Sequence, residues 1–321
     1  MKNIIKENAK NVIDLQIKAL KKLKNSIDHS FIDAVKEIIK CKSKVIICGV
    51  GKSGLIASKI SSTLSSVGTP SFSVSASDCS HGDLGKLTKD DLLILISYSG
   101  NTEELKNIIK YAKSIKIILI GIVSNKNSDL YKSANIKILL PEVEESGYGI
   151  VPTSSTTTQL SIGDALAISL MMEKQFDKLD FKKFHPAGNL GKKLKTASDI
   201  MLTGEKIPFI NENVKMKIAL KELNLKKQGF LVVINHKGLT KGIFTDGDLK
   251  RLMQKKTIIS NLKIKNFITK NPYMVKSNTL ATDILFQMNK KKITNVCVYD
   301  NKIKRKTIGI IHIHNLINLL K

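Results

Sequence analysis

Short apolar runs alternate with helical patterns between residues 45 and 140, and this alternation restricts the fold more than any other feature of the sequence. The runs are predicted to be buried strands, Val45–Cys48, Ser71–Val74, Leu92–Ile96, Ile117–Val123 and Ile136–Leu140. Strands that alternate with helices form a mainly parallel sheet with helices on both faces. The pattern therefore predicts an α/β fold, a doubly wound parallel five-stranded sheet.

Two of these predicted strands end in turns rich in glycine and hydroxyl residues. Residues 49–54 read Gly-Val-Gly-Lys-Ser-Gly, residues 97–102 read Ser-Tyr-Ser-Gly-Asn-Thr, and a helical pattern follows each turn. Glycine lets the backbone bend tightly, and the amide groups at a helix start favour an anion. Three hydroxyls around one glycine are more than a helix cap requires. The turns predict a phosphate pocket that uses Lys52, Ser53, Ser97, Ser99 and Thr102.

Two nucleotide-binding loops resemble the first turn but lack support in this sequence. A dinucleotide fold needs an acidic residue at the end of the second strand, where residues 69–74 read Thr-Pro-Ser-Phe-Ser-Val. The ATP-binding loop needs a glycine five positions before Gly51, and Ile46 stands there. The expected ligand is therefore a phosphorylated small molecule.

The formal net charge of +26 raises the question of a nucleic-acid or membrane partner. Arg251 and Arg305 are the only arginines, whereas proteins that read base edges depend on the bidentate arginine fork. The lysines are scattered through every segment. We therefore expect a solvated lysine surface that attracts acidic substrates, with no nucleic-acid partner and no membrane partner.

The cysteines and the N-terminus predict a reduced, cytoplasmic location. Cys41, Cys48, Cys79 and Cys297 show no paired spacing, and Cys48 and Cys297 fall inside apolar strand patterns. The N-terminus alternates lysines with aliphatic residues and has no signal-peptide pattern, and no apolar run approaches the length of a membrane span.

A second domain begins where the pattern changes. A long helical run from Thr153 to Phe176 closes the first domain, which we place at residues 1–195. After about Thr196 one pattern of helix, strand, turn, strand and helix occurs twice, so that Leu231 corresponds to Val296 and Gly242 to Gly309. We predict two small α/β modules, residues 199–257 and 265–321, packed face to face.

Five separated motifs occur in an order that closely resembles the D-arabinose 5-phosphate isomerases, over nearly the whole chain. They are residues 49–54, His81-Gly-Asp-Leu-Gly85, residues 97–102, Pro152-Thr-Ser-Ser-Thr-Thr157 and His185-Pro-Ala-Gly-Asn-Leu-Gly191. The resemblance implies a sugar isomerase domain followed by a tandem pair of cystathionine-β-synthase-type modules, assembled as a homo-oligomer, a tetramer. It implies interconversion of D-ribulose 5-phosphate and D-arabinose 5-phosphate without a cofactor, supplying the acidic eight-carbon sugar Kdo for lipopolysaccharide or capsule.

The resemblance also implies roles for individual residues. Catalytic roles fall on Lys52, Glu104, Glu145 and His185, and substrate contacts on His81, Gly68 and Thr69. This chain departs from the family after Glu145, where it reads Ser-Gly-Tyr-Gly in place of Ala-Cys-Pro-Leu. It also has Ser75 where relatives often carry a histidine implicated in zinc binding, so we expect no metal site.

The reaction requires one proton to move between neighbouring carbons and another between their oxygens, through an enediolate. The base must be poised near neutrality, and another group must stabilise the oxyanion. Glu104 or a histidine is the expected proton shuttle, with His185 reaching in from its own or a neighbouring subunit, and Lys52 neutralises the phosphate or the enediolate. His81 has small polar neighbours and no apolar face to pack against, which favours a functional role.

In the first small module, residues 242–248 have the form that holds a nucleotide in related modules. The resemblance assigns Thr245 to a phosphate and Asp248 to ribose hydroxyls, which implies a regulatory nucleotide or nucleotide-sugar. An equally open reading is that the pair of modules only assembles the oligomer. Two other functions stay open for the whole chain: a non-enzymatic sugar-phosphate sensor, and an isomerase of another phosphosugar.

Overall fold

The computed structural model describes residues 2–185, 194–254, 260–300, 303 and 305–320. The chain divides into two compact units, Met1–Phe184 and His185–Lys321, and each is described by itself. The domain limits expected from the sequence stay predictions.

The described part of the first unit holds a five-stranded sheet in the order β2-β1-β3-β4-β5, and every neighbouring pair is parallel. This arrangement confirms the predicted fold class. The chain leaves β1 toward β2 on one side and then returns to continue from β3 on the other, so β1 and β3 flank the switch point of the sheet. The strands are β1 (Val45–Gly49), β2 (Ser71–Ser75), β3 (Leu92–Ile96), β4 (Ile118–Val123) and β5 (Ile136–Leu139).

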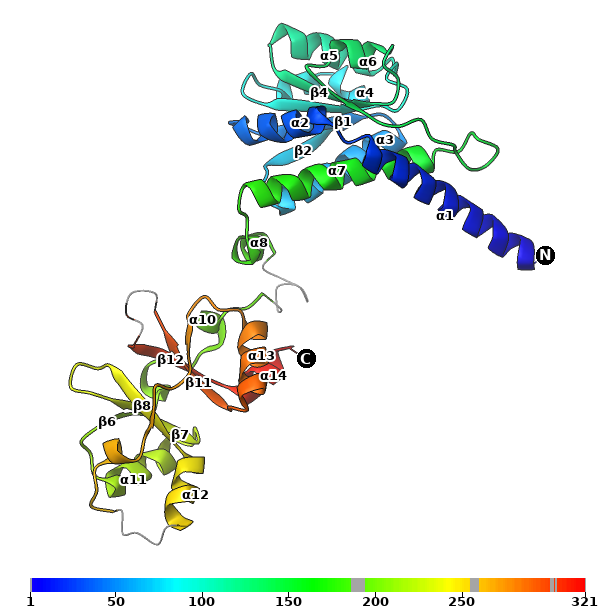
Figure 1. Ribbon diagram of the computed structural model, residues 1–321. Helices are drawn as coiled ribbons and strands as arrows, with labels where there is room; N and C mark the ends of the chain where they lie inside the picture. The colour runs from blue at the N-terminus through cyan, green and yellow to red at the C-terminus, as the bar shows by residue number, and fades with distance from the viewer. Residues whose placement is uncertain (1, 186–193, 255–259, 301–302, 304, 321) are drawn as a thin grey trace. The chain divides into compact units, whose positions relative to one another are not determined.

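Helices cover both faces of this sheet (Figure 1) because alternate strand residues point to opposite sides. Ile47 packs in the cluster that holds the apolar residues of α2, α3 and α7, whereas Ile46 and Cys48 pack in the cluster of α4, α5 and α6. The helices of the first unit are α1 (Lys2–Asn25), α2 (His29–Lys40), α3 (Lys52–Ser66), α4 (Ala76–Cys79), α5 (Leu105–Ser114), α6 (Asp129–Ser133), α7 (Ser154–Glu173) and α8 (Lys178–Phe184).

All four cysteines lie in the described part of the chain and are free thiols, as their spacing predicted. Burial raises the pKa of Cys48 to about 12 and that of Cys297 to about 12. Both side chains therefore stay protonated and pack as small apolar groups.

The described part of the second unit contains two small sheets, ordered β6-β7-β8-β9 and β10-β11-β12. Their strands are β6 (Phe209–Asn211), β7 (Phe230–Ile234), β8 (Thr240–Thr245), β9 (Thr269–Lys270), β10 (Met274–Lys276), β11 (Asn295–Tyr299) and β12 (Thr307–His312). The helices are α10 (Ala197–Ile200), α11 (Met216–Lys226), α12 (Asp246–Gln254), α13 (Ala281–Lys291) and α14 (Ile313–Leu320).

The pairing registers confirm the internal repeat. Leu231 lies opposite Phe244 in the first hairpin, and Val296, its predicted counterpart, lies opposite Ile311 in the second. Each hairpin also breaks register at the same place, after Val233 in one and after Val298 in the other. Bulges at equivalent positions indicate two copies of one backbone design.

The two modules pack face to face and exchange segments. Phe230 and Cys297, from the two central strands, share one apolar cluster. Ala197, which precedes the first copy, packs in the core of the second module, whereas Ile264 packs in the core of the first. The core of each module therefore includes a segment that borders the other module in the sequence.

Helices α3 and α7 approach so closely that a side chain at Gly163 has no room. A Cβ built on Gly163 would lie 2.1 Å from Cδ1 of Ile60, a residue that is itself buried. We expect Gly163→Val to lower the stability of the first unit by about 1–3 kcal/mol, the usual cost of overpacking.

The measurement is urea unfolding followed by circular dichroism. Gly85→Val is the matched control, because a Cβ on Gly85 meets no heavy atom within 4 Å. Equal unfolding midpoints for the two variants would show that the close approach of the helices is not a constraint.

Candidate active site

The two turns rich in glycine and hydroxyl residues, residues 49–54 and 97–102, are called the phosphate-type turns below. They follow neighbouring strands at one edge of the sheet. Gly49, the last residue of β1, pairs with Ile96, the last residue of β3. The turn at residues 50–51 and the loop at residues 97–104 therefore start side by side at the switch point. Ligands of open α/β sheets bind in this crevice, beyond the carboxyl ends of the strands.

The backbone of the first turn requires glycine, as Gly49 and Gly51 show. Gly51 has a φ of 56°, a left-handed conformation that glycine adopts easily, and a Cβ on Gly49 would lie 2.7 Å from the backbone of Ser53. Helix α3 begins at Lys52, and the amides of Gly54 and Leu55 donate to the Gly51 carbonyl at 3.1 and 3.2 Å. The amides of Lys52 and Ser53 come before these bonds and have no acceptor within the helix. The Lys52 side chain is exposed beside them.

The second turn, which we call the serine loop (residues 97–102), is organised by its own hydroxyls. Ser97 is buried, and its Oγ accepts a hydrogen bond of 3.0 Å from the amide of Gly100. Ser97 Oγ also lies 2.7 Å from Thr102 Oγ1. If Ser97 donates in that contact, the hydrogen of Thr102 is available to an anion. The Oγ of Ser99 accepts from the amide of Asn101 at 3.4 Å, which leaves its own hydrogen for a ligand.

Glu104 and His81 both lie along this edge. Helix α5 begins at Leu105, so Glu104 is an exposed residue at its N-terminus. Asn107, on the next turn, donates a hydrogen bond of 3.2 Å to Ser80 Oγ, and Ser80 precedes the exposed His81. This contact ties the His81 segment to the helix that Glu104 begins.

Glu145 uses its carboxylate to hold the start of α7. Oε2 accepts from the amides of Thr153 at 2.7 Å and Ser154 at 2.8 Å, and Oε1 accepts from the amide of Ser155 at 3.2 Å. The Thr153 hydroxyl also donates to Oε2, at 3.1 Å. Burial alone would raise the pKa of the Glu145 carboxyl, but the hydrogen bonds from Ser155, Thr153 and Ser154 outweigh burial and leave that pKa below its ordinary value.

The loop that carries Glu145 is tied to the serine loop by Tyr98. The Tyr98 hydroxyl donates to the carbonyl of Pro141 at 3.0 Å and accepts from the amide of Val143 at 3.0 Å. The start of α7 also meets the first turn, because the Ser53 hydroxyl donates to Oε1 of Gln159 at 3.1 Å. The structure therefore brings together the two phosphate-type turns, the Glu145 loop and the start of α7. Sequence reasoning did not select Tyr98 or Gln159; a buried glutamine in an apolar helical stripe is the signal that marks Gln159.

Gly68 and Thr69 do not join this cluster within one chain. They precede β2, whose first residue Ser71 pairs with Val45 at the amino edge of the parallel sheet, opposite the crevice. Lys174 donates to Thr69 Oγ1 at 2.8 Å, and the Phe176 ring covers Gly68. Strands of this length separate the two edges by about 15 Å, further than one sugar phosphate reaches.

His185 is the first residue of the second unit and follows α8. The rest of its motif, residues 186–191, lies outside the described residues. Its role as a catalytic residue stays a prediction.

In the second unit, Thr245 lines a cleft of about 590 Å³ between the modules, together with Arg251, Tyr273, Lys292 and His312. The Asp248 carboxylate accepts hydrogen bonds from neighbouring residues of its own module. Oδ2 accepts from the amide and the hydroxyl of Thr245, both at 2.9 Å, and Oδ1 accepts from Arg251. These three bonds leave one lone pair of Oδ1 for a ribose hydroxyl, and the predicted contact of Asp248 with ribose stays a prediction.

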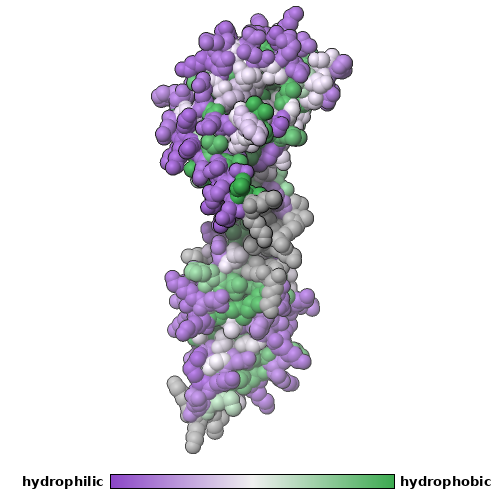
Figure 2. Space-filling view, turned by 90° about the vertical axis from the view of Figure 1, so that its right-hand side faces the viewer, coloured by the Kyte–Doolittle hydropathy of each residue, from purple (hydrophilic) through white to green (hydrophobic). Residues whose placement is uncertain are grey.

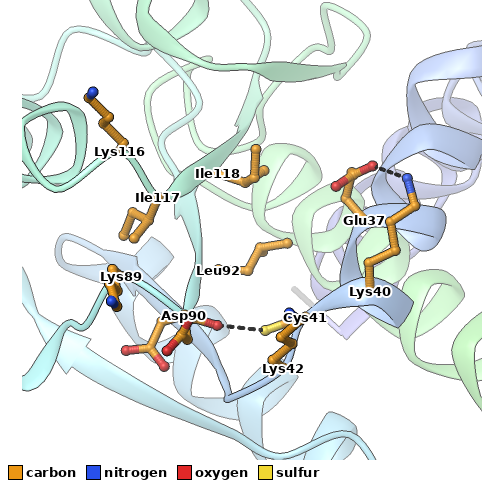
Figure 3. A pocket seen from close by; sticks show the side chains of 11 residues that line it. Glu37, Lys40, Cys41, Lys42, Lys89, Asp90, Leu92, Lys116, Ile117 and Ile118 are labelled. Atoms are coloured by element: carbon orange, nitrogen blue, oxygen red, sulfur yellow. Dashed lines mark hydrogen bonds and ion pairs between the residues drawn. The ribbon is translucent and has the colours of Figure 1, made fainter.

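A pocket of about 210 Å³ lies at the amino ends of β3 and β4, far from the serine loop. Figure 3 shows Lys40 paired with Glu37 at 2.6 Å and the Cys41 thiol directed at the carbonyl of Asp90 at 3.6 Å. The residues that line this pocket include lysines beside carboxylates, and they include neither of the phosphate-type turns. We therefore place the candidate site at the carboxyl edge.

Among the described residues, no group of three or more His, Cys, Asp and Glu could hold a metal ion. Ser75 caps α4 by accepting from the amide of Asp78 at 3.3 Å. No helix in the described ranges is long and apolar enough to span a membrane. Figure 2 shows hydrophilic residues spread over the visible face of the first unit.

Comparisons with known proteins match both units. The SIS domain family matches residues 37–169 and the CBS domain family residues 264–321. The arabinose 5-phosphate isomerase KdsD of Francisella tularensis is 39% identical over 317 residues, 97% of this chain and 96% of the relative. The enzyme of the same name from Yersinia pestis is 38% identical over 310 residues, 96% and 94%. A solved structure of an Escherichia coli CFT073 protein in complex with arabinose 5-phosphate is 35% identical, with a TM-score of 0.56 over 58% of this chain and 100% of that one.

The contacts of Glu145 generate a pH-dependent prediction. Its pKa is lower in the folded state than in the unfolded chain, so its stabilising effect is present above the unfolded value, about 4.3, and is lost as the pH falls through the folded value. Glu145→Gln should reduce the stability at pH 7 by about 1.5–3 kcal/mol, and the difference from wild type should shrink below about pH 4.

Urea unfolding at pH 7 and at pH 3.5 measures this difference. Glu144→Gln is the control, since the exposed Glu144 side chain makes no hydrogen bond to the described residues. A difference for Glu145→Gln that stays constant with pH would contradict the ionised contact.

Proposed function

Because this chain belongs to the arabinose 5-phosphate isomerase family, we propose that it interconverts D-arabinose 5-phosphate and D-ribulose 5-phosphate. The named relatives carry that activity in their names, and the solved relative is in complex with arabinose 5-phosphate. One observation of this molecule carries the proposal. The two phosphate-type turns, which carry the hydrogen-bond donors for a phosphate, start side by side at the switch point of the sheet. Glu104 and His81 lie along the same edge.

The chemistry divides between the two ends of the sugar phosphate. The phosphate is held by the amides that open α3, by Lys52 and Ser53, and by Ser99 and Thr102 of the serine loop. At the other end, a base removes the proton from the carbon beside the carbonyl, and the electron pair forms the enediolate. The same base returns the proton to the neighbouring carbon, while the hydroxyl proton passes between the two oxygens. We assign the base to Glu104 or a histidine, His81 or His185.

Glu145 receives a different role from the proton shuttle. A base works best when its pKa lies near the working pH, and the hydrogen bonds to Glu145 hold its pKa below the ordinary carboxyl range. We infer that Glu145 is a positioning residue. It keeps the start of α7 and the loop at residues 146–152 beside the serine loop.

In our proposal the product, arabinose 5-phosphate, is a precursor for another biosynthetic reaction. The isomerase acts in the cytoplasm and supplies arabinose 5-phosphate to the synthesis of Kdo for lipopolysaccharide or capsule. A non-enzymatic sensor and an isomerase of another phosphosugar are the alternatives, and measurement of turnover on the two pentose phosphates separates them from this function.

The tandem modules provide a regulatory site in this proposal. The cleft between them is lined by the cations Arg251 and Lys292 and by the aromatic ring of Tyr273. Cations suit a phosphate and an aromatic ring suits a base. We propose that a nucleotide or nucleotide-sugar binds there with Thr245 on its phosphate.

We further propose that the protein is a homo-oligomer, a tetramer. The N-terminal part of α1 extends away from the body of the first unit (Figure 1), and the helix exposes an apolar stripe. Ile5, Ile13 and Ile17 on this stripe are 66%, 55% and 44% exposed. A second copy would cover the stripe. It would also let Gly68 and Thr69 serve a site other than that of their own chain.

The activity test is direct. Purified protein with ribulose 5-phosphate and a chelator should form arabinose 5-phosphate, observed by NMR. Thr102→Val should lower kcat/KM by about 10- to 100-fold, because the loss of one hydrogen bond to a charged group costs about 1.5–3 kcal/mol.

Lys52→Ala should lower kcat/KM at least as far. Ser62→Ala, at an exposed position of α3, is the control and should keep wild-type turnover. No aldose from the wild-type protein would refute the isomerase, and Glu104→Gln with full turnover would exclude Glu104 as the base.

The oligomer is tested by light scattering after gel filtration. Ile13→Lys with Ile17→Lys should convert the oligomer into smaller species, because charge on the stripe opposes its burial. Asn11→Lys, on the opposite side of α1, should leave the mass unchanged. A wild-type protein with the mass of one chain would rule out the assembly.

A further inference from the structure

Gln159 occupies a place where an apolar residue would be expected. Helix α7 buries one face, on which Gln159 precedes Ile162, Leu166 and Leu170 at helical spacing. Gln159 is 1% exposed. A buried amide without a partner costs a few kcal/mol, whereas a leucine would pack there without that cost. The hydrogen-bond partner of Gln159 therefore explains why this position holds a glutamine.

That partner is Ser53 in the first phosphate-type turn, 3.1 Å from the Gln159 amide oxygen. The two helices hold this distance firmly. Gly163 allows α7 to approach Ile60 of α3, and Lys59 of α3 pairs with Asp164 of α7 at 2.7 Å. The contact between Ser53 and Gln159 is thus set by the rigid pair of helices and not by a loop.

A hydroxyl carries one hydrogen, and this limits what Ser53 does in the structure. While Ser53 donates to Gln159, it faces the crevice only with lone pairs, which repel a phosphate. An amide rotated by half a turn presents NH₂ to the same oxygen. Ser53 then accepts from Gln159 and turns its own hydrogen toward the phosphate. Glutamine performs both roles with little change of shape, whereas glutamate only accepts and methionine does neither.

We propose that Gln159 is a positioning residue of the phosphate site, whose buried amide reverses the hydrogen bond with Ser53 when the sugar phosphate binds. This inference rests on the proposed function for the identity of the ligand. It deepens that function, because it assigns affinity for the phosphate to a residue on the helix behind the turn. Gln159 itself moves no proton of the reaction.

The test compares Gln159→Met, Ser53→Ala and the double variant in the full-length protein. Binding of inorganic phosphate is measured by calorimetry, and KM and kcat are measured with arabinose 5-phosphate. Each single variant should raise the Kd of phosphate and the KM about 10-fold, with kcat within 3-fold of wild type. The double variant should be no worse than Ser53→Ala alone, since the two residues act as one unit.

Two further variants separate positioning from packing. Gln159→Glu keeps the size of the side chain but fixes Ser53 as the donor, so it should weaken phosphate binding more than Gln159→Met does. Glu173→Gln, an exposed residue at the far end of α7, is the control and should leave Kd and KM unchanged. Circular dichroism confirms that each variant is folded.

Additive losses in the double variant, or wild-type phosphate affinity in Gln159→Glu, would overturn the proposal. Failure of the wild-type protein to turn over arabinose 5-phosphate would refute the proposed function instead. The calorimetric comparison would still decide whether Gln159 and Ser53 are coupled.

Discussion

The parallel pairing of β1 with β3 is the constraint on which the site depends. Parallel strands end at one edge, and the register that sets Gly49 beside Ile96 starts both phosphate-type turns at neighbouring points. The helices that follow then direct their N-terminal amides into one crevice. A shift of this register by one residue would send the two turns to different depths and reverse the faces of the strands.

The second constraint is the packing of α7 against α3. The missing side chain of Gly163 lets the helices approach, and this contact carries Gln159 to Ser53. The same helix begins where Glu145 accepts its backbone amides, so one buried element supports both the turn and the loop. The exposed groups, Glu104 and His81, are then free to serve a proton transfer while buried groups hold the frame.

The sequence alone predicted the sheet, its phosphate-type turns and the repeat, because each of them follows from the order of residues within a short segment. Alternating apolar runs indicated the strands, and glycine beside hydroxyl residues indicated the turns. The correspondence of Leu231 with Val296 was confirmed by hairpins that bulge at equivalent positions. The exchange of segments between the modules has no such local pattern, since Ala197 and Ile264 are ordinary apolar residues whose partners depend on the packed fold.

Sequence determined which residue types stand at the ends of the strands, and so the class of ligand. Tertiary structure alone decided the use of each side chain. It placed Gly68 and Thr69 at the far edge, engaged the Glu145 carboxylate with α7, and paired Ser53 with a glutamine 106 positions away. The physical reason is that hydrogen-bond partners and pKa values depend on burial and on neighbours from distant segments, which only strand register and helix packing bring together.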